Sequence, residues 1–313
     1  MTPHVGRAPV GVQRPDVRSR PAVPRSTAIQ RPSAPGVGGT WVPLGPKPVV
    51  GAGTCCFTNP TRLSANYGTT SGRVTSIATD PANGLIVYAG TAGGGVWKSI
   101  DGGANWVSTT AGQTSLAGAE GASAIGALAI DPNNSQIVYA GTGEDNQSDS
   151  QAGWGILKTI DGGTTWTNIG SGTFARQHIG GLVVDKLNSQ RIFAATDIGL
   201  YRSIDGGTTW TKVTLPTPTP IPSLTATQAA TQIIQDPSNP AKFWVSVTDF
   251  CVGDAGDIMT GDGASTWSIS PIRYTGLASR IGLGVAPNGV AYFAAAALPG
   301  PCNRELFHCQ RQG

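Results

Sequence analysis

The sequence feature that most constrains the fold is an eight-residue phrase that occurs four times. This phrase, called here the Asp-Trp repeat, has Ser or Thr first, Asp third, Gly fourth and Trp last. Its copies are residues 99–106, 159–166, 203–210 and the more divergent 260–267. The four aspartates lie 60, 44 and 57 residues apart, which indicates an array of similar structural units. A residue that recurs in every unit is expected to build the unit rather than to perform chemistry.

Each Asp-Trp repeat closes a larger unit of about 37 to 46 residues. In the first unit, β-branched and apolar runs predict strands over residues 74–79, 85–90, 96–99 and 106–109, separated by Asp, Asn, Gly and Pro turns. Four short antiparallel strands per unit are the pattern of a β-propeller blade. No helical periodicity competes with strands after residue 40. The sequence therefore predicts an all-β propeller with about five blades, at residues 73–110, 125–170, 178–214, 230–270 and 279–313.

The residues of the Asp-Trp repeat are predicted to hold the blades together. The Asp carboxylate can accept hydrogen bonds from nearby backbone N–H groups, and the glycines tolerate turn conformations that are closed to other residues. The Trp is expected to pack between neighbouring sheets. The structural residues predicted in this way are Asp101, Trp106, Asp161, Trp166, Asp205, Trp210, Asp262 and Trp267.

The three clean copies resemble the Asp-box, or BNR-repeat, propellers, whose pattern is Ser/Thr-x-Asp-x-Gly-x-Thr-Trp. The match departs from that pattern at Asn105, where Thr is usual. This group includes sialidases, xyloglucanase-type glycoside hydrolases, sortilin-type receptors and photosystem assembly factors. The resemblance covers about residues 40–313 and implies the fold. It implies no single function, because these relatives share blades rather than chemistry.

The fifth unit leaves the closure of the ring open. Strands are predicted over residues 280–287, 290–296 and 305–309, but the sequence ends at Gly313 where the next Asp turn is expected. Residues 38–45 resemble the close of a repeat, so a strand over 40–45 could complete the fifth blade and remove an exposed sheet edge. The alternative is a fragment of a larger ring. The resembling propellers usually have six or more blades, which favours the fragment.

Residues 1–36 contain seven prolines and six arginines but one acidic residue, Asp16. This segment lacks apolar periodicity and is predicted to be a disordered tail, separate from the propeller of residues 37–313. Aromatic residues are not interleaved with the arginines, so nucleic-acid binding is not expected. No signal-peptide core and no membrane-spanning run is visible, and no membrane partner is expected. The low lysine content nevertheless fits a secreted or cell-surface protein, expected to be a monomer.

The cysteines and histidines do not suggest a metal site. Their spacing matches no common zinc pattern, so no metal and no cofactor are expected. Cys302 could form a disulfide with Cys309, and Cys251 with either Cys55 or Cys56.

Candidate functional residues follow from propeller geometry. The first strand of each blade starts at the mouth of the central channel, the loops between second and third strands reach the same face, and the Asp turns lie opposite. The candidate ligand-binding residues at the mouth are Arg73, Glu144, Asp145, Trp154, His178, Asp197 and Arg280, with Arg176 just before the third blade. Acidic and basic side chains around a funnel suit a polar ligand such as a sugar.

Glycoside hydrolysis requires two carboxylates across the scissile bond. The candidate catalytic pairs are Glu144 with Asp197 and Asp145 with Asp197. The resemblance argues against catalysis, because xyloglucanase-type relatives carry a catalytic Asp in the stretch that resembles residues 88–94, where this chain has Ala92. The Phe/Tyr-Arg-Ile-Pro motif of sialidases is also absent. The predicted function is therefore binding of a carbohydrate or protein ligand at the mouth, and the alternative is an incomplete or degraded glycoside hydrolase.

Overall fold

The computed structural model describes residues 73–116, 123–144, 151–216, 229–248, 257–264, 266–270 and 278–297. All described residues lie within the unit Leu44–Gly313. The predicted tail, the strands expected at 40–45 and 305–309, all five cysteines and Asp145 lie outside the described residues.

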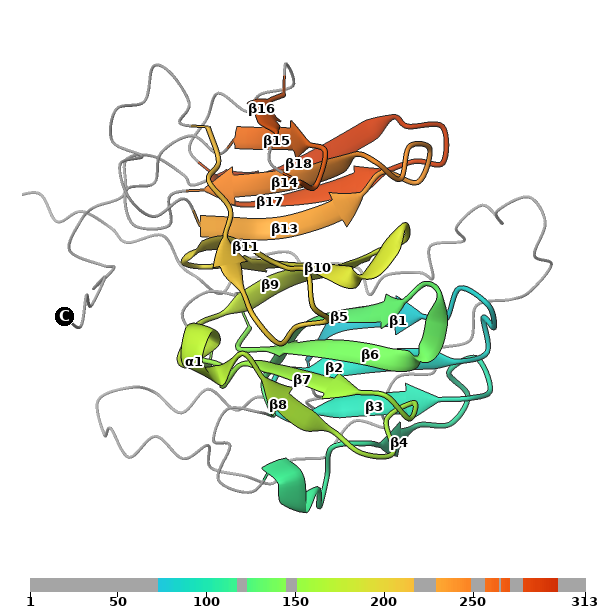
Figure 1. The fold of residues 1–313 in the computed structure, drawn as a ribbon. Coiled ribbons are helices and arrows are strands. Elements are labelled where there is room, and N and C mark those ends of the chain that lie inside the picture. Colours follow the sequence, from blue (N-terminus) through green and yellow to red (C-terminus); the bar gives the residue numbers. More distant parts are fainter. Residues whose placement is uncertain are drawn as a thin grey trace, which may run out of the picture. The chain divides into compact units, whose positions relative to one another are not determined.

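The described residues form four sheets of four antiparallel strands and one sheet of two. Figure 1 draws the strands as arrows, coloured by their place in the sequence. Sheet 1 contains β1 (Val74–Thr79), β2 (Val87–Thr91), β3 (Val96–Ser99) and β4 (Val107–Ser108). Sheet 2 contains β5 (Ile125–Asp131), β6 (Asn134–Thr142), β7 (Ile156–Thr159) and β8 (Thr167–Ile169). Sheet 3 contains β9 (Ile179–Asp185), β10 (Asn188–Thr196), β11 (Gly199–Ser203) and β12 (Thr211–Lys212). Sheet 4 contains β13 (Ala229–Gln235), β14 (Phe243–Thr248), β15 (Asp257–Gly261) and β16 (Trp267–Ile269), and sheet 5 contains β17 (Ala278–Val285) and β18 (Ala291–Ala297).

Strands that are adjacent in the sequence are hydrogen-bonded neighbours in every sheet. The first strands of successive sheets also contact each other, β1 with β5, β5 with β9, β9 with β13 and β13 with β17. In a β-propeller, successive blades meet along their first strands in the same way. The predicted fold class, a β-propeller of four-stranded antiparallel blades, is confirmed.

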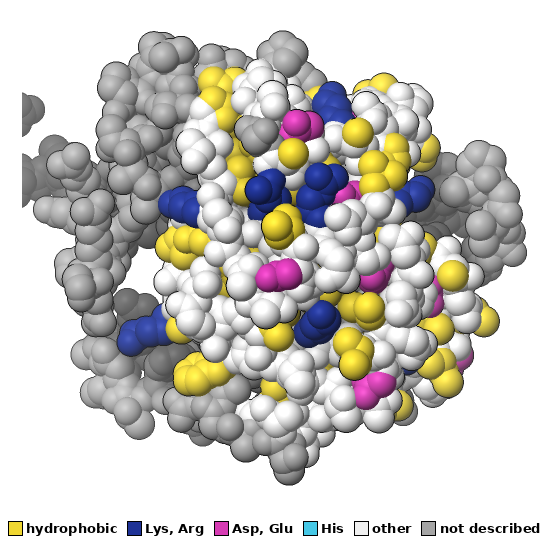
Figure 2. Space-filling model, in the orientation of Figure 1, with side chains coloured by type: hydrophobic (Ala, Val, Ile, Leu, Met, Phe, Trp, Pro, Cys, Tyr) yellow, Lys and Arg dark blue, Asp and Glu magenta, His cyan; other side chains and the backbone are white. Residues whose placement is uncertain are grey.

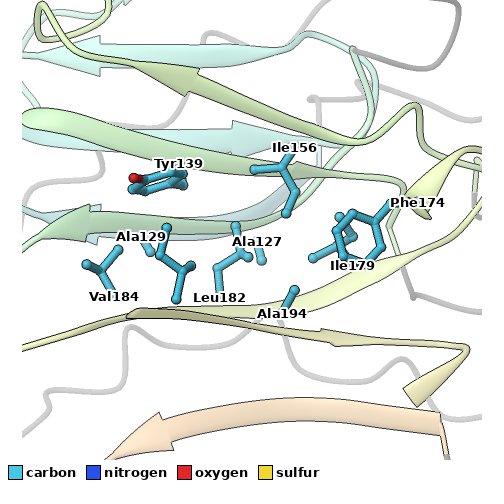
Figure 3. Close-up of a cluster of buried hydrophobic side chains, with 10 residues drawn as sticks. Ala127, Ala129, Tyr139, Ile156, Phe174, Ile179, Leu182, Val184 and Ala194 are labelled. Atoms are coloured by element: carbon cyan, nitrogen blue, oxygen red, sulfur yellow. The ribbon is translucent and has the colours of Figure 1, made fainter. Parts of the chain in front are cut away.

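The core lies between successive sheets, where apolar side chains from both sides interdigitate. Figure 3 shows Tyr139 and Ile156 of sheet 2 above Leu182, Val184 and other residues of sheet 3. The long apolar run of β6 is buried from Val138 to its end because neighbouring strands or sheets cover it. Burying these side chains is the dominant stabilising term in such a fold.

Burial at equivalent positions shows that each sheet depends on its neighbours. Leu128 in β5 and Leu182 in β9 are buried, whereas Ile77, at the same position in β1, is 65% exposed. In the second strands, Tyr139 is buried, but Tyr292 of sheet 5 is 62% exposed. These two outer faces lack a neighbouring sheet among the described residues.

Two short helices were not predicted, η2 (Thr114–Leu116) and α1 (Ser171–Phe174). Four residues make little more than one helical turn, too few for a periodic pattern in the sequence. The α1 helix follows Gly170, whose φ of 69° lies in the left-handed region. The helix places Phe174 in the core, edge-on to Trp210 with 5.1 Å between ring centroids.

The Asp-Trp repeats form closely similar turns between the third and fourth strands. Oδ1 of Asp101 accepts hydrogen bonds from Ser99 Oγ at 2.7 Å and from the Asn105 backbone N–H at 2.9 Å. Oδ1 of Asp161 accepts the same two bonds, from Thr159 Oγ1 at 2.7 Å and from the Thr165 N–H at 2.9 Å. Asp101 is exposed and Asp161 is half-buried, and these bonds stabilise the ionised form of both carboxylates. The bonds from Asn105 and Ser99 lower the pKa of Asp101 to about 2. Those from Thr165 and Thr159 lower the pKa of Asp161 to about 2 as well.

The third repeat is built like the first two, while the fourth differs. Asp205 accepts hydrogen bonds from Thr209, both side chain and backbone, and from Ser203, and they lower its pKa to about 2. Asp262 accepts bonds from the backbone N–H groups of Ala264 at 2.8 Å and Thr266 at 3.1 Å. The divergent sequence of the fourth copy therefore keeps part of the same turn.

The second and third repeats also bind the preceding sheet through hydrogen bonds to a glycine carbonyl, a contact that was not predicted from the sequence. The Gly162 carbonyl of sheet 2 accepts hydrogen bonds from Tyr88 Oη at 2.9 Å and Lys98 Nζ at 2.7 Å of sheet 1. Tyr139 and Lys158 of sheet 2 bind the next repeat in the same way, at 3.3 and 2.8 Å from the Gly206 carbonyl. The repeats are therefore joints between sheets as well as turns within them.

The tryptophans of the repeats lie against the preceding sheet where one is described. Trp166 is fully buried among sheet 1 and sheet 2 residues, and its Nε1 donates to Thr109 Oγ1 at 3.3 Å. Trp267 packs near Phe193 of sheet 3. Trp106, in the first sheet, is half-buried.

A second set of hydrogen bonds between sheets uses aspartates at the far ends of the first strands, Asp131 as the last residue of β5 and Asp80 directly after β1. Ser135 of sheet 2 donates to Asp80 of sheet 1 at 2.6 Å, and Ser189 of sheet 3 donates to Asp131 of sheet 2 at 2.8 Å. Burial opposes the charge of Asp80, but the bonds from Ser135 and from the backbone of Ala82 outweigh it and lower its pKa. The spacing of these aspartates was visible in the sequence, but their partners in the next sheet were not.

Candidate functional site

The strand starts and the loops between second and third strands lie together, at what we call the mouth end of the sheets. The Gly143 N–H donates to the Ala124 carbonyl at 2.7 Å, and the Ile179 N–H donates to the Gly143 carbonyl at 3.0 Å. In sheet 3, the Asp197 N–H donates to the His178 carbonyl at 3.2 Å. The Asp-Trp repeats occupy the opposite end, called the turn end. Backbone bonds thus connect the mouth residues of sheets 2 and 3.

An ion pair joins sheets 1 and 2 at the mouth end. Arg73, just before β1, pairs through its guanidinium with Glu144, just after β6. The Glu144 side chain is 1% exposed and that of Arg73 is 40% exposed. A buried carboxylate requires such a partner because its desolvation is costly. Two of the predicted ligand-binding residues therefore contact each other.

A second pair lies in sheet 3. His178 Nδ1 is 2.9 Å from Asp197 Oδ2, and the His178 backbone N–H donates to Asp197 Oδ1 at 3.2 Å. Both side chains are about 30% exposed. The two pairs adjoin through the backbone bond between Gly143 and Ile179, so four candidate residues are brought to neighbouring positions.

Trp154 projects from the loop between β6 and β7, with 39% of its surface exposed. Its backbone is held on both sides, since its N–H donates to Thr142 Oγ1 at 2.6 Å and its carbonyl accepts from Asn168 Nδ2 at 3.1 Å. An exposed indole on a fixed backbone is a preorganised apolar surface.

The backbone of Arg176 lies in the left-handed region, with a φ of 65°. No other non-glycine residue in the described part of the chain has a positive φ. The Arg176 N–H donates to the Gly153 carbonyl at 2.9 Å, and the Gly153 N–H donates to the Gln177 carbonyl at 2.9 Å. The sequence placed Arg176 near the mouth, but it gave no sign of the unusual φ, which is most common at Gly, Asn and Asp.

The remaining candidates stay predictions. Arg280 lies in β17, and its backbone is paired with that of Ala296. Asp145 lies outside the described residues. The two described carboxylates of the candidate catalytic pairs each have a basic partner, Arg73 for Glu144 and His178 for Asp197. The described arrangement can therefore present charge and hydrogen bonds to a polar ligand.

The described residues contain no group of three or more His, Cys, Asp or Glu side chains that could hold a metal ion. Within the same residues, no helix has the length and apolar character to span a membrane. On the face shown in Figure 2, basic and acidic side chains are interspersed among uncharged ones.

Comparison with known proteins adds to this picture. No family model matches the chain, and neither does any curated protein. Among solved structures, an ancestral GH74 enzyme is 17% identical, with a TM-score of 0.52 over 69% of this chain and 28% of its own. The GH74 enzyme of Niastella koreensis is 25% identical, with a TM-score of 0.51 over 72% of this chain and 33% of its own. The GH74 xyloglucanase of Xanthomonas campestris is 21% identical, with a TM-score of 0.48 over 67% and 32%.

The fold and the comparisons together define the class of protein. The chain has a β-propeller fold similar to that of the GH74 enzymes, and it spans about a third of the length of these solved structures. At this level of identity, the likeness to the ancestral enzyme concerns the fold alone, and the chemistry must be argued from the site.

Proposed function

We propose that this chain is an Asp-box propeller that binds a glycan at its mouth end. The observation that carries the proposal is Trp154, whose indole is exposed at the mouth although its backbone is hydrogen-bonded on both sides. Ligand sites combine aromatic surface with a few fixed polar groups. The Arg73–Glu144 and His178–Asp197 pairs supply such groups.

The likeness to the Niastella koreensis GH74 enzyme supports a glycan rather than a protein as the ligand. The turns between the third and fourth strands support membership of the Asp-box group, because Asp101, Asp161 and Asp205 make the same hydrogen bonds within their turns. The absence of oligosaccharide binding in the test described below would favour a protein ligand instead.

Binding without catalysis is favoured by the state of the two candidate carboxylates. A retaining or inverting glycosidase holds two carboxyl groups on either side of the scissile bond. Here Glu144 is buried against Arg73, and Asp197 is bonded to His178. Ala92 in place of the catalytic Asp of xyloglucanase-type relatives points the same way. Glycoside hydrolysis is the second candidate, which the likeness to GH74 enzymes supports.

The test is isothermal titration of the protein with neutral and acidic oligosaccharides, together with an assay for released reducing ends. Trp154→Ala is expected to weaken binding of the active glycan about tenfold, by analogy with stacking contacts worth about 1–3 kcal/mol. Ile160→Ala is the matched control, because Ile160 is also exposed and apolar but lies at the turn end. Equal affinity of both variants would contradict the proposal. Turnover that Glu144→Gln abolishes would establish the hydrolase instead, and the absence of binding to any oligosaccharide would reject the glycan.

A further inference from the structure

Arg176 is the residue at the mouth end whose conformation most needs an explanation. Its φ of 65° lies in the left-handed region, where a side chain with a Cβ is strained and glycine is not. The backbone at this position contributes to the fold, because the Arg176 N–H donates a hydrogen bond to the Gly153 carbonyl. A glycine would make the same bond without strain. The arginine side chain is therefore the part that folding does not require.

The two described candidate carboxylates of the mouth end already have basic partners. Glu144 pairs with Arg73, and Asp197 pairs with His178. The Arg176 side chain is exposed, and within the described ranges its guanidinium has no ion pair or hydrogen bond. It is thus a cation at the mouth that the described acidic groups leave available.

The exposed indole of Trp154 belongs to the same hydrogen-bonded segment. Residues Gly153 and Arg176–Gln177 exchange two backbone hydrogen bonds, both at 2.9 Å, and Trp154 follows Gly153 directly. The aromatic surface and the available cation are therefore presented by two chain segments that are fixed against each other. A ligand that uses both needs an apolar face next to an anionic group.

We propose that the ligand is an acidic glycan, in which sugar rings carry carboxylates. The Trp154 indole would contact the face of a sugar ring, and the Arg176 guanidinium would bind the carboxylate of the same or the next sugar. Guanidinium and carboxylate match in a two-bond geometry that neutral sugars do not offer. This inference rests on the proposed glycan binding and names the class of sugar.

The test uses an oligogalacturonate and its methyl ester, which have the same sugar rings but differ in charge. The wild-type protein is expected to bind the acid about tenfold more tightly than the ester, as a charged hydrogen bond of about 1.5 kcal/mol or more would give. Arg176→Gly is expected to bind both at the level of the ester. Its melting temperature should be equal to or higher than that of the wild type, because the strain is relieved. Lys186→Gln removes an exposed cation at the turn end and should leave the preference unchanged.

The outcomes separate this inference from the proposed function. Equal affinity for acid and ester would overturn the acidic ligand and leave glycan binding standing. A preference for the acid that survives Arg176→Gly, or that Lys186→Gln reduces as much, would overturn the role of Arg176. If neither form binds but a neutral oligosaccharide does, the acidic class is wrong. If no oligosaccharide binds, the proposed function itself fails.

Discussion

At the turn end, sheets 2 and 3 carry the same set of interactions. The carbonyls of Gly162 and Gly206 each accept a Tyr hydroxyl and a Lys ammonium from the sheet before them. At the mouth end, Thr142 and Thr196 each donate to a glycine carbonyl at 2.7 Å, but the exposed side chains of the two sheets differ. Sheet 2 presents Trp154, and sheet 3 presents Arg176 next to the His178–Asp197 pair.

The difference separates two roles of residues in a repeat protein. Side chains that recur in each sheet make bonds within turns and between sheets, so their contribution is to the free energy of unfolding. Residues that occur once leave an exposed indole and an available cation, which contribute little to folding. We therefore assign stability to the turn end and ligand binding to the mouth end, and the predictions below test this division.

The largest effect is expected from Trp166→Ala. Trp166 is fully buried between sheets 1 and 2, and truncation of such a side chain costs about 3–5 kcal/mol. Trp106→Ala is the matched control, because Trp106 holds the same position in the first repeat but is half-buried. Urea unfolding should show a clearly larger loss for Trp166→Ala. Equal losses would mean that packing against the preceding sheet is not the source of the stability.

Thr159→Val should have a smaller effect. The buried Thr159 hydroxyl donates to Asp161 at 2.7 Å and accepts the Gly163 N–H at 2.9 Å. Removing it leaves the buried Gly163 N–H without its partner, at a cost of about 1–3 kcal/mol. Thr164→Val, which removes an exposed hydroxyl that donates to the Asp161 carbonyl, should change the free energy of unfolding by less. The reverse order would contradict this assignment.

The turn aspartates predict a sensitivity to acid. Their hydrogen bonds lower the pKa of Asp101 and Asp161 from 3.8 to about 2. A carboxyl whose pKa is lower in the folded state stabilises the fold above its unfolded pKa. The melting temperature should therefore be constant above about pH 5, and part of it should be lost as the pH falls from about 4 to about 2. Asp161→Asn should weaken this dependence, and an unchanged pH profile would argue against a role for the ionised turn.

The smallest effect on stability is expected from Trp154→Ala. An exposed side chain outside the core changes the free energy of unfolding by about 0.5 kcal/mol or less. Circular dichroism melts of the variant and the wild type should coincide. A loss comparable to that of Thr159→Val would show that the mouth loop is part of the folding core.

Much of the fold could be predicted because the Asp-Trp repeat marks the same turn in each sheet. The hydrogen bonds between sheets were harder to predict, since they pair residues such as Tyr88 and Gly162 that are 74 residues apart. One signal was available, because Tyr88 and Tyr139 each precede the residues Ala-Gly-Thr, and Lys98 and Lys158 each lie three residues before the Asp of their repeat.

The candidate site could be predicted as a location but not as a geometry. Propeller topology brings Arg73, Glu144 and His178 to one end of the sheets. The choice of partners, such as Glu144 with Arg73, depends on side-chain conformations and on the spacing between sheets, which a sequence does not contain. The left-handed φ of Arg176 could not be predicted from the sequence, because arginine rarely adopts this conformation.

The most direct test of the division between the two ends is thermal unfolding of Thr159→Val and Trp154→Ala, each with and without oligogalacturonate. A ligand that binds the folded state raises the melting temperature by mass action. Thr159→Val should have a lower melting temperature than the wild type, and the ligand should raise it as it raises that of the wild type. Trp154→Ala should have the melting temperature of the wild type, and the ligand should not raise it. The opposite pattern, with binding lost at the turn end and stability lost at the mouth end, would contradict the account.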